Sequence, residues 1–191
     1  MNATATQFLI AGESATKRNA LSKELVTRGL LARTAPYAQA VGLLDGDASG
    51  ALVIVPTFRK VSNSDTWGGI AVELTRNFEL IQHYVRRAIA QRRGGHVLAL
   101  LPSAAAIGDP LDTPTSAVTG GMLSLLRTLA LELRKLDMTV NTILYDEVNG
   151  EIVHMGDVVA LLATLAAQAH GAITGQEIYA CNGNDAGRLH P

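Results

Sequence analysis

TSAVTGGMLSLLRTLALEL (115–133), followed closely by MTVNTIL (138–144), is the stretch that decides the fold. In the first segment, apolar residues recur at steps of three and four: Met122, Leu125, Leu126, Leu129, Ala130 and Leu133. This spacing predicts a helix with one buried face. The second segment is short and mostly apolar, which predicts a buried strand. A helix followed at once by a buried strand is typical of an α/β domain.

The rest of the chain repeats this alternation. Strands are predicted at 7–12, 51–56, 96–101 and 177–181, and further helices at 14–29, 64–95 and 156–168. Ser64 or Asp65 is the expected N-cap of the long helix. Between 30 and 50, LLART is consistent with a short strand and AQAVGLL with either a helix or a strand. The pattern predicts one domain, 1–191, with a doubly wound parallel sheet covered by helices on both faces.

Composition narrows the class of protein. The net charge of -1 lacks the basic surplus of a nucleic-acid-binding domain, and Cys181 is the only cysteine, which favours a reducing compartment. No apolar run approaches the ~20 residues that cross a bilayer, and Met1 to Gln7 does not resemble a secretion signal. We therefore expect a soluble cytoplasmic protein. The low charged fraction of 17% favours association with other chains.

SAVTGGMLSLLRTLALELRKLDMTVNTI and ITGQEIYACNGN, together with the order of elements, resemble the short-chain dehydrogenase/reductase family. In that family the first segment is a Tyr-x-x-x-Lys helix followed by a strand containing Val-Asn. The second is an Ile-Thr-Gly strand that ends in a glycine-rich turn. The resemblance covers nearly the whole chain and implies a Rossmann-type fold, in which NAD would lie above the carboxyl ends of the strands.

The cofactor motifs of the family are altered in this sequence. The family places Thr-Gly-x-x-x-Gly-x-Gly where this chain has the residues from 11 to 18, and only Gly12 is retained. Thr16 and Arg18 replace the other two glycines, and Glu13 adds a negative charge where phosphates would bind. Two later turns also differ: Ile54, Val55, Pro56 and Thr57 replace Asn-Asn-Ala-Gly, and Tyr145 and Asp146 replace Pro-Gly. The resemblance therefore implies that this chain has no cofactor-binding residues of its own.

The catalytic positions differ as well. Alignment on LALEL places Thr115 at the family's tyrosine and Thr119 at its lysine, and a threonine hydroxyl is too weak an acid to replace the tuned tyrosine. The family's serine falls at Pro102 or Ser103, and its helix asparagine at Glu73. We expect no catalytic residue for hydride transfer in this chain, and therefore no activity on its own.

Two regions look shorter than in the family: the one between the first two clear strands, and the one after Leu144. The family places adenosine-binding elements in the first and a substrate-covering loop in the second. Five histidines are scattered without metal-ligand spacing: His83, His96, His154, His170 and His190. We expect no metal site, although His154 with Asp146 and Glu147 could form a makeshift polar site in the shortened loop.

The helices around 65–93 and 115–136 look intact, and in the family these two pair with a neighbouring subunit in a four-helix bundle. Gly120 and Gly121 would allow close helix approach there. The favoured hypothesis is a non-catalytic pseudoenzyme subunit of a heteromeric oxidoreductase, expected to be a heterotetramer. An active short-chain dehydrogenase homologue would be the partner and would hold NAD. Such assemblies occur in the family, one of them acting on a CoA-thioester alcohol in anaerobic aromatic degradation.

Two alternatives remain open. In the first, the chain is a regulatory or ligand-binding module that holds an acyl-CoA or a nucleotide through Lys17 and Arg18. The basic helix end formed by Arg86, Arg87, Arg92 and Arg93 would assist, although such a cluster is more often a solvated helix terminus. In the second, the chain is an enzyme of altered chemistry that uses Ser103, Glu73 or His154.

Overall fold

The computed structural model describes residues 6–46, 50–56, 66–168 and 172–183. A six-stranded parallel sheet forms the middle layer, in the order β2-β1-β3-β4-β5-β8. Its strands are β1 (Gln7–Ala11), β2 (Leu31–Ala35), β3 (Ala51–Ile54), β4 (Gly95–Pro102), β5 (Met138–Tyr145) and β8 (Glu177–Ala180). The predicted doubly wound parallel fold is confirmed.

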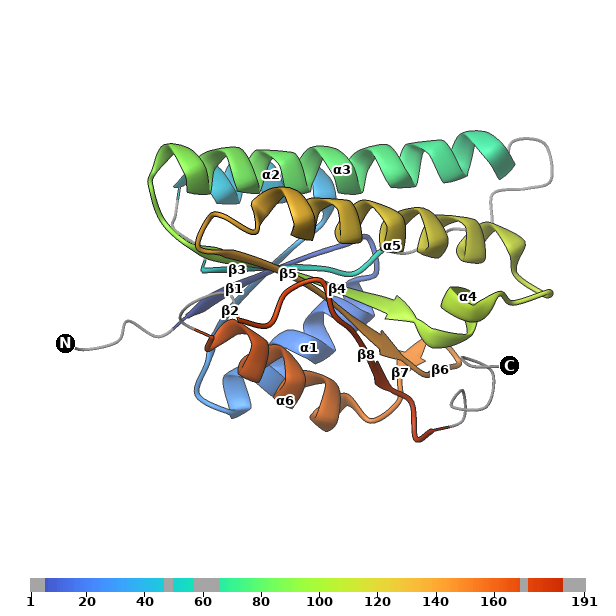
Figure 1. The fold of residues 1–191 in the computed structure, drawn as a ribbon. Helices are drawn as coiled ribbons and strands as arrows, with labels where there is room; N and C mark the ends of the chain where they lie inside the picture. The colour runs from blue at the N-terminus through green and yellow to red at the C-terminus, as the bar shows by residue number, and fades with distance from the viewer. Residues whose placement is uncertain (1–5, 47–49, 57–65, 169–171, 184–191) are drawn as a thin grey trace.

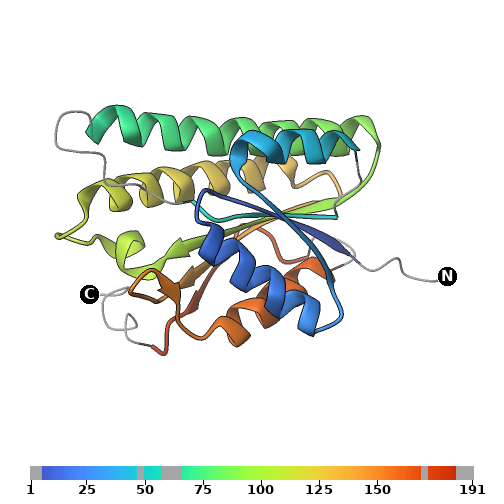
Figure 2. The same ribbon diagram turned by 180° about the vertical axis from the view of Figure 1, so that it is seen from behind.

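Helices cover both faces of the sheet (Figures 1 and 2). One face carries α2 (Tyr37–Gly46), α3 (Thr66–Ala90) and α5 (Thr113–Leu133), and the other carries α1 (Ala15–Thr27) and α6 (Met155–Ala166). Alternate residues of each central strand serve the two layers: in β1, Leu9 packs towards α3 while Phe8 and Ile10 pack towards α1. All eight residues of β5 are buried, as expected for an inner strand covered on both faces.

The segment from 30 to 50, which the sequence left ambiguous, contains β2 and α2, so LLART contributes a strand and AQAVGLL is helical. Two features were not predicted: the short helix α4 (Ser103–Ile107), and the hairpin of β6 (Glu147–Val148) and β7 (Glu151–Ile152). In the helix predicted at 14–29, Leu21 and Leu25 are buried, while the apolar Val26 is 56% exposed. Ser64 and Asp65, the predicted caps of α3, lie outside the described residues.

The described sheet has six strands, as the usual dinucleotide-binding sheet does, but its first half, before the order reverses, contains only β1 and β2. In the usual sheet, three strands form the first half, and the third lies outermost beside the second. Here β2 is itself the edge strand, because the described chain passes from β2 through α2 to β3 without another strand. Beyond β5, only the small β6–β7 hairpin stands before α6. Both regions predicted to be shortened are therefore short in the structure.

Candidate functional site

A cavity of about 460 Å³ opens at the carboxyl ends of β4 and β5, beside the first turn of α1. In a doubly wound sheet this edge is where ligands bind, near the point at which the strand order reverses; here that point lies between β1 and β3. We call this cavity the cleft. Three carboxylates and one amine lie among its lining side chains: Asp109, Asp112, Glu147 and Lys17. The charged groups of the cleft are therefore mainly acidic, which disfavours a polyphosphate.

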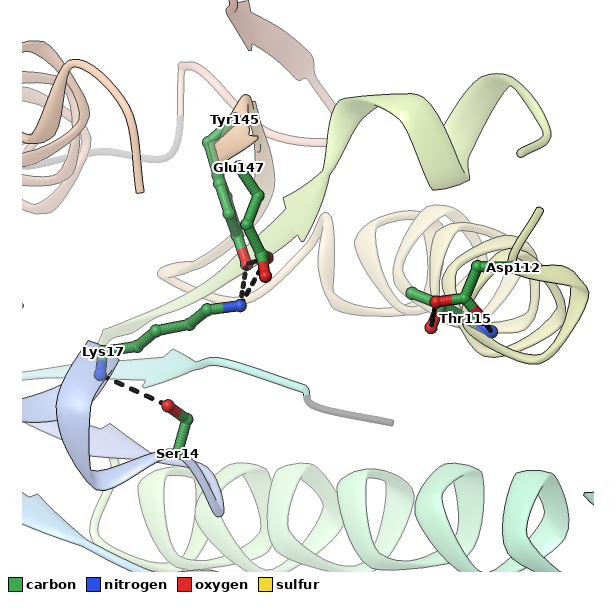
Figure 3. Close-up of polar contacts among 6 residues, drawn as sticks. All are labelled: Ser14, Lys17, Asp112, Thr115, Tyr145 and Glu147. Atoms are coloured by element: carbon green, nitrogen blue, oxygen red, sulfur yellow. Dashed lines mark hydrogen bonds and ion pairs between the residues drawn. The ribbon is translucent and has the colours of Figure 1, made fainter. Parts of the chain in front are cut away.

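Lys17, Tyr145 and Glu147 meet inside the cleft, as Figure 3 shows. The Lys17 amine lies 2.5 Å from Glu147 Oε2 and 3.1 Å from the Tyr145 hydroxyl. Lys17 begins on α1, directly after β1, yet it reaches the end of β5, which two strands separate from β1 in the sheet. Its side chain is only 7% exposed, so its charge is neutralised within the chain rather than offered to a ligand.

Tyr145 lies fully buried beneath this ion pair. Burial, with the nearby Glu147 carboxylate as a second cause, raises the pKa of the Tyr145 hydroxyl above its ordinary value. In a dehydrogenase of the resembled family, a lysine would lower the pKa of the active tyrosine. The electrostatics at Tyr145 run the opposite way, so its hydroxyl is a poor proton donor at neutral pH.

The N-terminal turn of α1 is occupied by the chain's own groups. Ser14 caps the helix, with its hydroxyl accepting from the Lys17 backbone N–H at 3.3 Å. The buried Arg18 guanidinium donates to the Gly12 carbonyl. Because one backbone donor and both basic side chains already have partners, little at this helix end is available to a pyrophosphate.

Gly12, the one retained glycine of the motif, has a packing role. A Cβ built at this position would lie 2.3 Å from the carbonyl oxygen of Val55, far inside contact distance. The ends of β1 and β3 therefore approach so closely that only glycine fits, and the Val55 N–H donates to the Ala11 carbonyl at 2.8 Å. This contact explains the glycine without any phosphate.

The positions matched to the catalytic tyrosine and lysine lie on α5, which contains neither residue type. Thr115 lines the cleft, but its N–H and hydroxyl both donate to the carboxylate of Asp112, the N-cap of α5 (Figure 3). Thr119 is buried. Ser103, at the start of α4, is buried and donates to Asp146 at 2.7 Å. The Thr115 hydroxyl therefore belongs to a helix cap, and the Ser103 hydroxyl to a contact with the residue that follows β5.

Glu73 lies away from the cleft, in a buried polar network between α2 and α3. The Tyr37 hydroxyl lies 3.1 Å from Glu73 Oε1 and 2.8 Å from Asn77 Oδ1, and the Asn77 amide donates to the Glu73 carbonyl. Burial first, and then the Glu73 charge, raises the pKa of Tyr37. Glu73 therefore joins two helices, and it does not share a site with Ser103.

His154 is an exposed N-cap of α6 with a left-handed backbone (φ 54°), and it is not among the residues that line the cleft. His83 contacts Asp45 at 2.9 Å and His96 contacts Thr139 at 2.8 Å, at separate places. His170 and His190 lie outside the described residues. Within the described segments, no three His, Cys, Asp or Glu residues are grouped closely enough to hold a metal ion.

The four arginines near the end of α3 lie at different places, with Arg86 exposed on the helix. Arg87 pairs with Asp45 at 3.1 Å and donates to the Asp45 carbonyl, which ties α3 to the last turn of α2. Arg92 and Arg93 instead line a separate cavity between the ends of α3 and α5. The basic helix end that the sequence predicts is therefore not one cluster.

Sequence reasoning missed Glu147 as the partner of Lys17. The two residues are 130 positions apart in the sequence, and no sequence motif contains both of them. The available signal was Lys17 itself, a cation in the first turn of the helix that follows a buried strand. A buried amine needs an opposite charge, and Glu147 lies two residues after the end of β5.

Several solved structures are similar to the whole fold of this chain. The acetoin dehydrogenase of Salmonella typhimurium matches with a TM-score of 0.74 and 16% identity over 94% of this chain and 97% of that one. A short-chain dehydrogenase/reductase family oxidoreductase from Burkholderia thailandensis matches with a TM-score of 0.73 and 17% identity. The match covers 96% of this chain and 94% of that one. A variant of actinorhodin polyketide ketoreductase, solved with NADPH, matches with a TM-score of 0.70 and 14% identity. The match covers 94% of this chain and 98% of that one.

This chain has the fold of these oxidoreductases. At the level of sequence, no family model and no curated protein matches it. Among the described helices, none is long and apolar enough to cross a membrane. In this Rossmann-like fold, the cleft lies at the carboxyl edge of the sheet, where doubly wound proteins bind ligands.

Proposed function

We propose that this chain is a non-catalytic member of the short-chain dehydrogenase/reductase family that works as a subunit beside an active homologue. The active subunit would hold NAD and supply the tyrosine and lysine. This chain would complete the oligomer and stabilise its partner's site. The expected assembly is a heterotetramer.

The ion pair between Lys17 and Glu147 is the observation that carries this proposal. It lies where the family motif would leave space for a pyrophosphate, and its amine is buried and neutralised. Opening it for a dinucleotide would leave a charge without its partner, at a cost of about 1–3 kcal/mol because Glu147 is 30% exposed. The acidic lining of the cleft adds repulsion.

The exposed apolar side chains on α3 support the assembly. Trp67, Phe78 and Ile89 follow one another at intervals of eleven residues, which places them on one stripe of the helix. They are 77%, 46% and 48% exposed. Leu131, at 66%, is a further exposed apolar residue on α5, which packs beside α3. Burying such a stripe against another subunit would be favourable.

The resemblance also suggests a specific form of the proposal. This chain looks like the inactive subunit of the alcohol dehydrogenase acting on 2-(hydroxy(phenyl)methyl)succinyl-CoA in anaerobic toluene breakdown. No described residue of the cleft identifies that substrate. This specific form of the proposal therefore depends on which homologue is the partner. An adjacent reading frame encoding a complete short-chain dehydrogenase would support it.

The test is co-expression with such a complete homologue, followed by size-exclusion chromatography with light scattering and an NAD-dependent assay. We expect a mixed complex in which NAD binds only the homologue's sites, with the isolated chain inactive. A chain that remains separate from every such homologue, or that turns over substrate alone, would contradict the proposal.

The alternative of a regulatory module that binds an acyl-CoA or nucleotide in the cleft has less support. It depends on Lys17 and Arg18, and both make contacts within the chain. Titration with CoA esters would test it directly.

A further inference from the structure

We propose that the cavity between the C-terminal ends of α3 and α5 binds a small carboxylate with an apolar body. This cavity, here called the helix-end cavity, has a volume of about 310 Å³ and lies apart from the cleft. That volume is at the lower end of the range for small-ligand pockets. The proposal does not depend on the cleft, but Ile89 belongs both to this cavity and to the exposed apolar stripe of α3, so binding is tested on the isolated chain.

The helix-end cavity carries a surplus of positive charge. Arg92, Arg93 and Lys135 line it, against the single carboxylate of Asp137. Arg93 is held in place: its guanidinium lies 5.3 Å from the centre of the Tyr84 ring, and it donates to Gln91 at 2.8 Å. Within the described part of the chain, neither Arg92 nor Lys135 forms a salt bridge. Two cations are thus available to one anionic group.

Arg92 stands in a position that favours glycine. The Arg93 N–H bonds to the Ala88 carbonyl and the Arg92 N–H to the Ile89 carbonyl, which is the Schellman arrangement at a helix end. Its left-handed residue is Arg92, with φ +50°. Glycine adopts this conformation without strain, so capping alone does not explain an arginine here.

A solvated helix end is the competing explanation, because basic residues in a last turn interact favourably with the helix dipole. That effect requires no cavity and no strained residue beyond the last turn. The helix-end cavity also has an apolar side, formed partly by the half-exposed Ile89 and Leu136, with the buried Met138 beside them. Cations next to apolar surface fit a ligand with one anionic head and a short hydrocarbon body, better than a bare phosphate.

The probe is hexanoate, with inorganic phosphate as a bare anion and hexanamide as a neutral analogue. Binding to the intact chain is followed by NMR at the methyl groups of Ile89 and Leu136. We expect saturable shifts with hexanoate, weaker binding of phosphate and no saturation with hexanamide.

Two variants test the assignment. Arg92→Gly removes a cation and relieves the left-handed strain, so the melting temperature should stay equal or rise while hexanoate binds about tenfold or more weakly. Lys135→Gln should weaken binding similarly without a backbone effect. Arg86→Gln, at an exposed position of α3 outside the cavity lining, is the matched control and should bind normally.

Unsaturable hexanoate shifts in the unsubstituted chain would overturn the proposal. Hexanamide that binds as tightly as hexanoate would also overturn it. The same holds if Arg92→Gly and Lys135→Gln both bind hexanoate as tightly as the unsubstituted chain does. A loss of binding in Arg86→Gln equal to that in Arg92→Gly would also overturn it, because it would indicate a diffuse surface charge.

Discussion

At the scale of single residues, Lys17 is the side chain that most affects which ligands the cleft can bind. Its amine is buried, and the Glu147 carboxylate 2.5 Å away compensates its charge. A buried pair costs desolvation on both sides, so it contributes little net stability, but removing one partner leaves an uncompensated charge. We therefore expect the Lys17–Glu147 pair to affect ligand binding in the cleft more than the free energy of unfolding.

Lys17→Met should lower the free energy of unfolding by about 1–3 kcal/mol, a range reduced because Glu147 is 30% exposed. The double variant with Glu147→Leu should recover most of that loss, since neither charge remains. Urea unfolding measures both. If the double variant is as unstable as the sum of the single variants, the two residues are not coupled.

His96 gives a pH dependence whose sign follows from its burial. Burial lowers the pKa of His96 below its ordinary value of 6.5, while the imidazole contacts Thr139 at 2.8 Å. The unfolded chain then takes up this proton at a higher pH than the folded chain does. Stability should fall as the pH drops through 6.5 towards the folded pKa, and fall no further from this group below it.

The variant His96→Gln retains a polar partner for Thr139 and has no titrating proton. Its unfolding free energy should depend less steeply on pH between neutrality and mildly acidic conditions than that of the unsubstituted chain. Denaturant unfolding at a series of pH values measures this. Two parallel profiles would show that His96 titrates alike in the folded and unfolded chains.

At the scale of elements, close approaches of backbone define the layers. Gly12 brings the end of β1 against β3, and in α5 a Cβ on Gly121 would lie 2.9 Å from Leu74 of α3. Gly121 therefore serves helix packing inside the chain. Gly120 faces open space, so of the predicted glycine pair only Gly120 is free for an approaching partner.

Gly12→Ala should destabilise the chain by about 2 kcal/mol or more, because its Cβ would collide with the Val55 carbonyl. Gly120→Ala is the matched control: it adds the same methyl group at an open helical position and should stabilise by up to about 1 kcal/mol. Thermal unfolding of both compares them. Equal effects of the two changes would mean that the β1–β3 contact is looser than described.

The regular elements could be predicted because their signals are local. α5 and β5 follow from periodicity within their own segments, and the structure changes their ends by only two residues or fewer. α4 and the β6–β7 hairpin were missed because five-residue and two-residue elements carry almost no periodic signal. The Lys17–Glu147 contact was missed because it joins elements far apart in sequence, and no local pattern specifies it.

At the scale of the whole molecule, the two faces of the sheet differ in what they expose. α1 and α6 cover one face, while α2, α3 and α5 cover the other (Figure 1). On that second face, α3 carries the stripe of Trp67, Phe78 and Ile89. Apolar side chains in such an arrangement favour association. The proposed subunit role predicts that this face, and not the α1 face, contacts the partner.

Phe78→Glu should prevent formation of the mixed complex while the variant remains folded, because a carboxylate would be buried at the interface. Val26→Glu is the control: it makes the same kind of change at a 56% exposed position of α1, and it should leave the complex intact. Light scattering and circular dichroism separate assembly from folding. Complex formation by both variants would show that the partner binds elsewhere.

We propose that the buried Lys17–Glu147 pair keeps a dinucleotide out of the cleft. The decisive measurement is calorimetric titration of the isolated chain with NAD and with NADP. We expect no saturable heat with either cofactor. One-to-one saturable binding, with the nucleotide located between α1 and the end of β5, would contradict it.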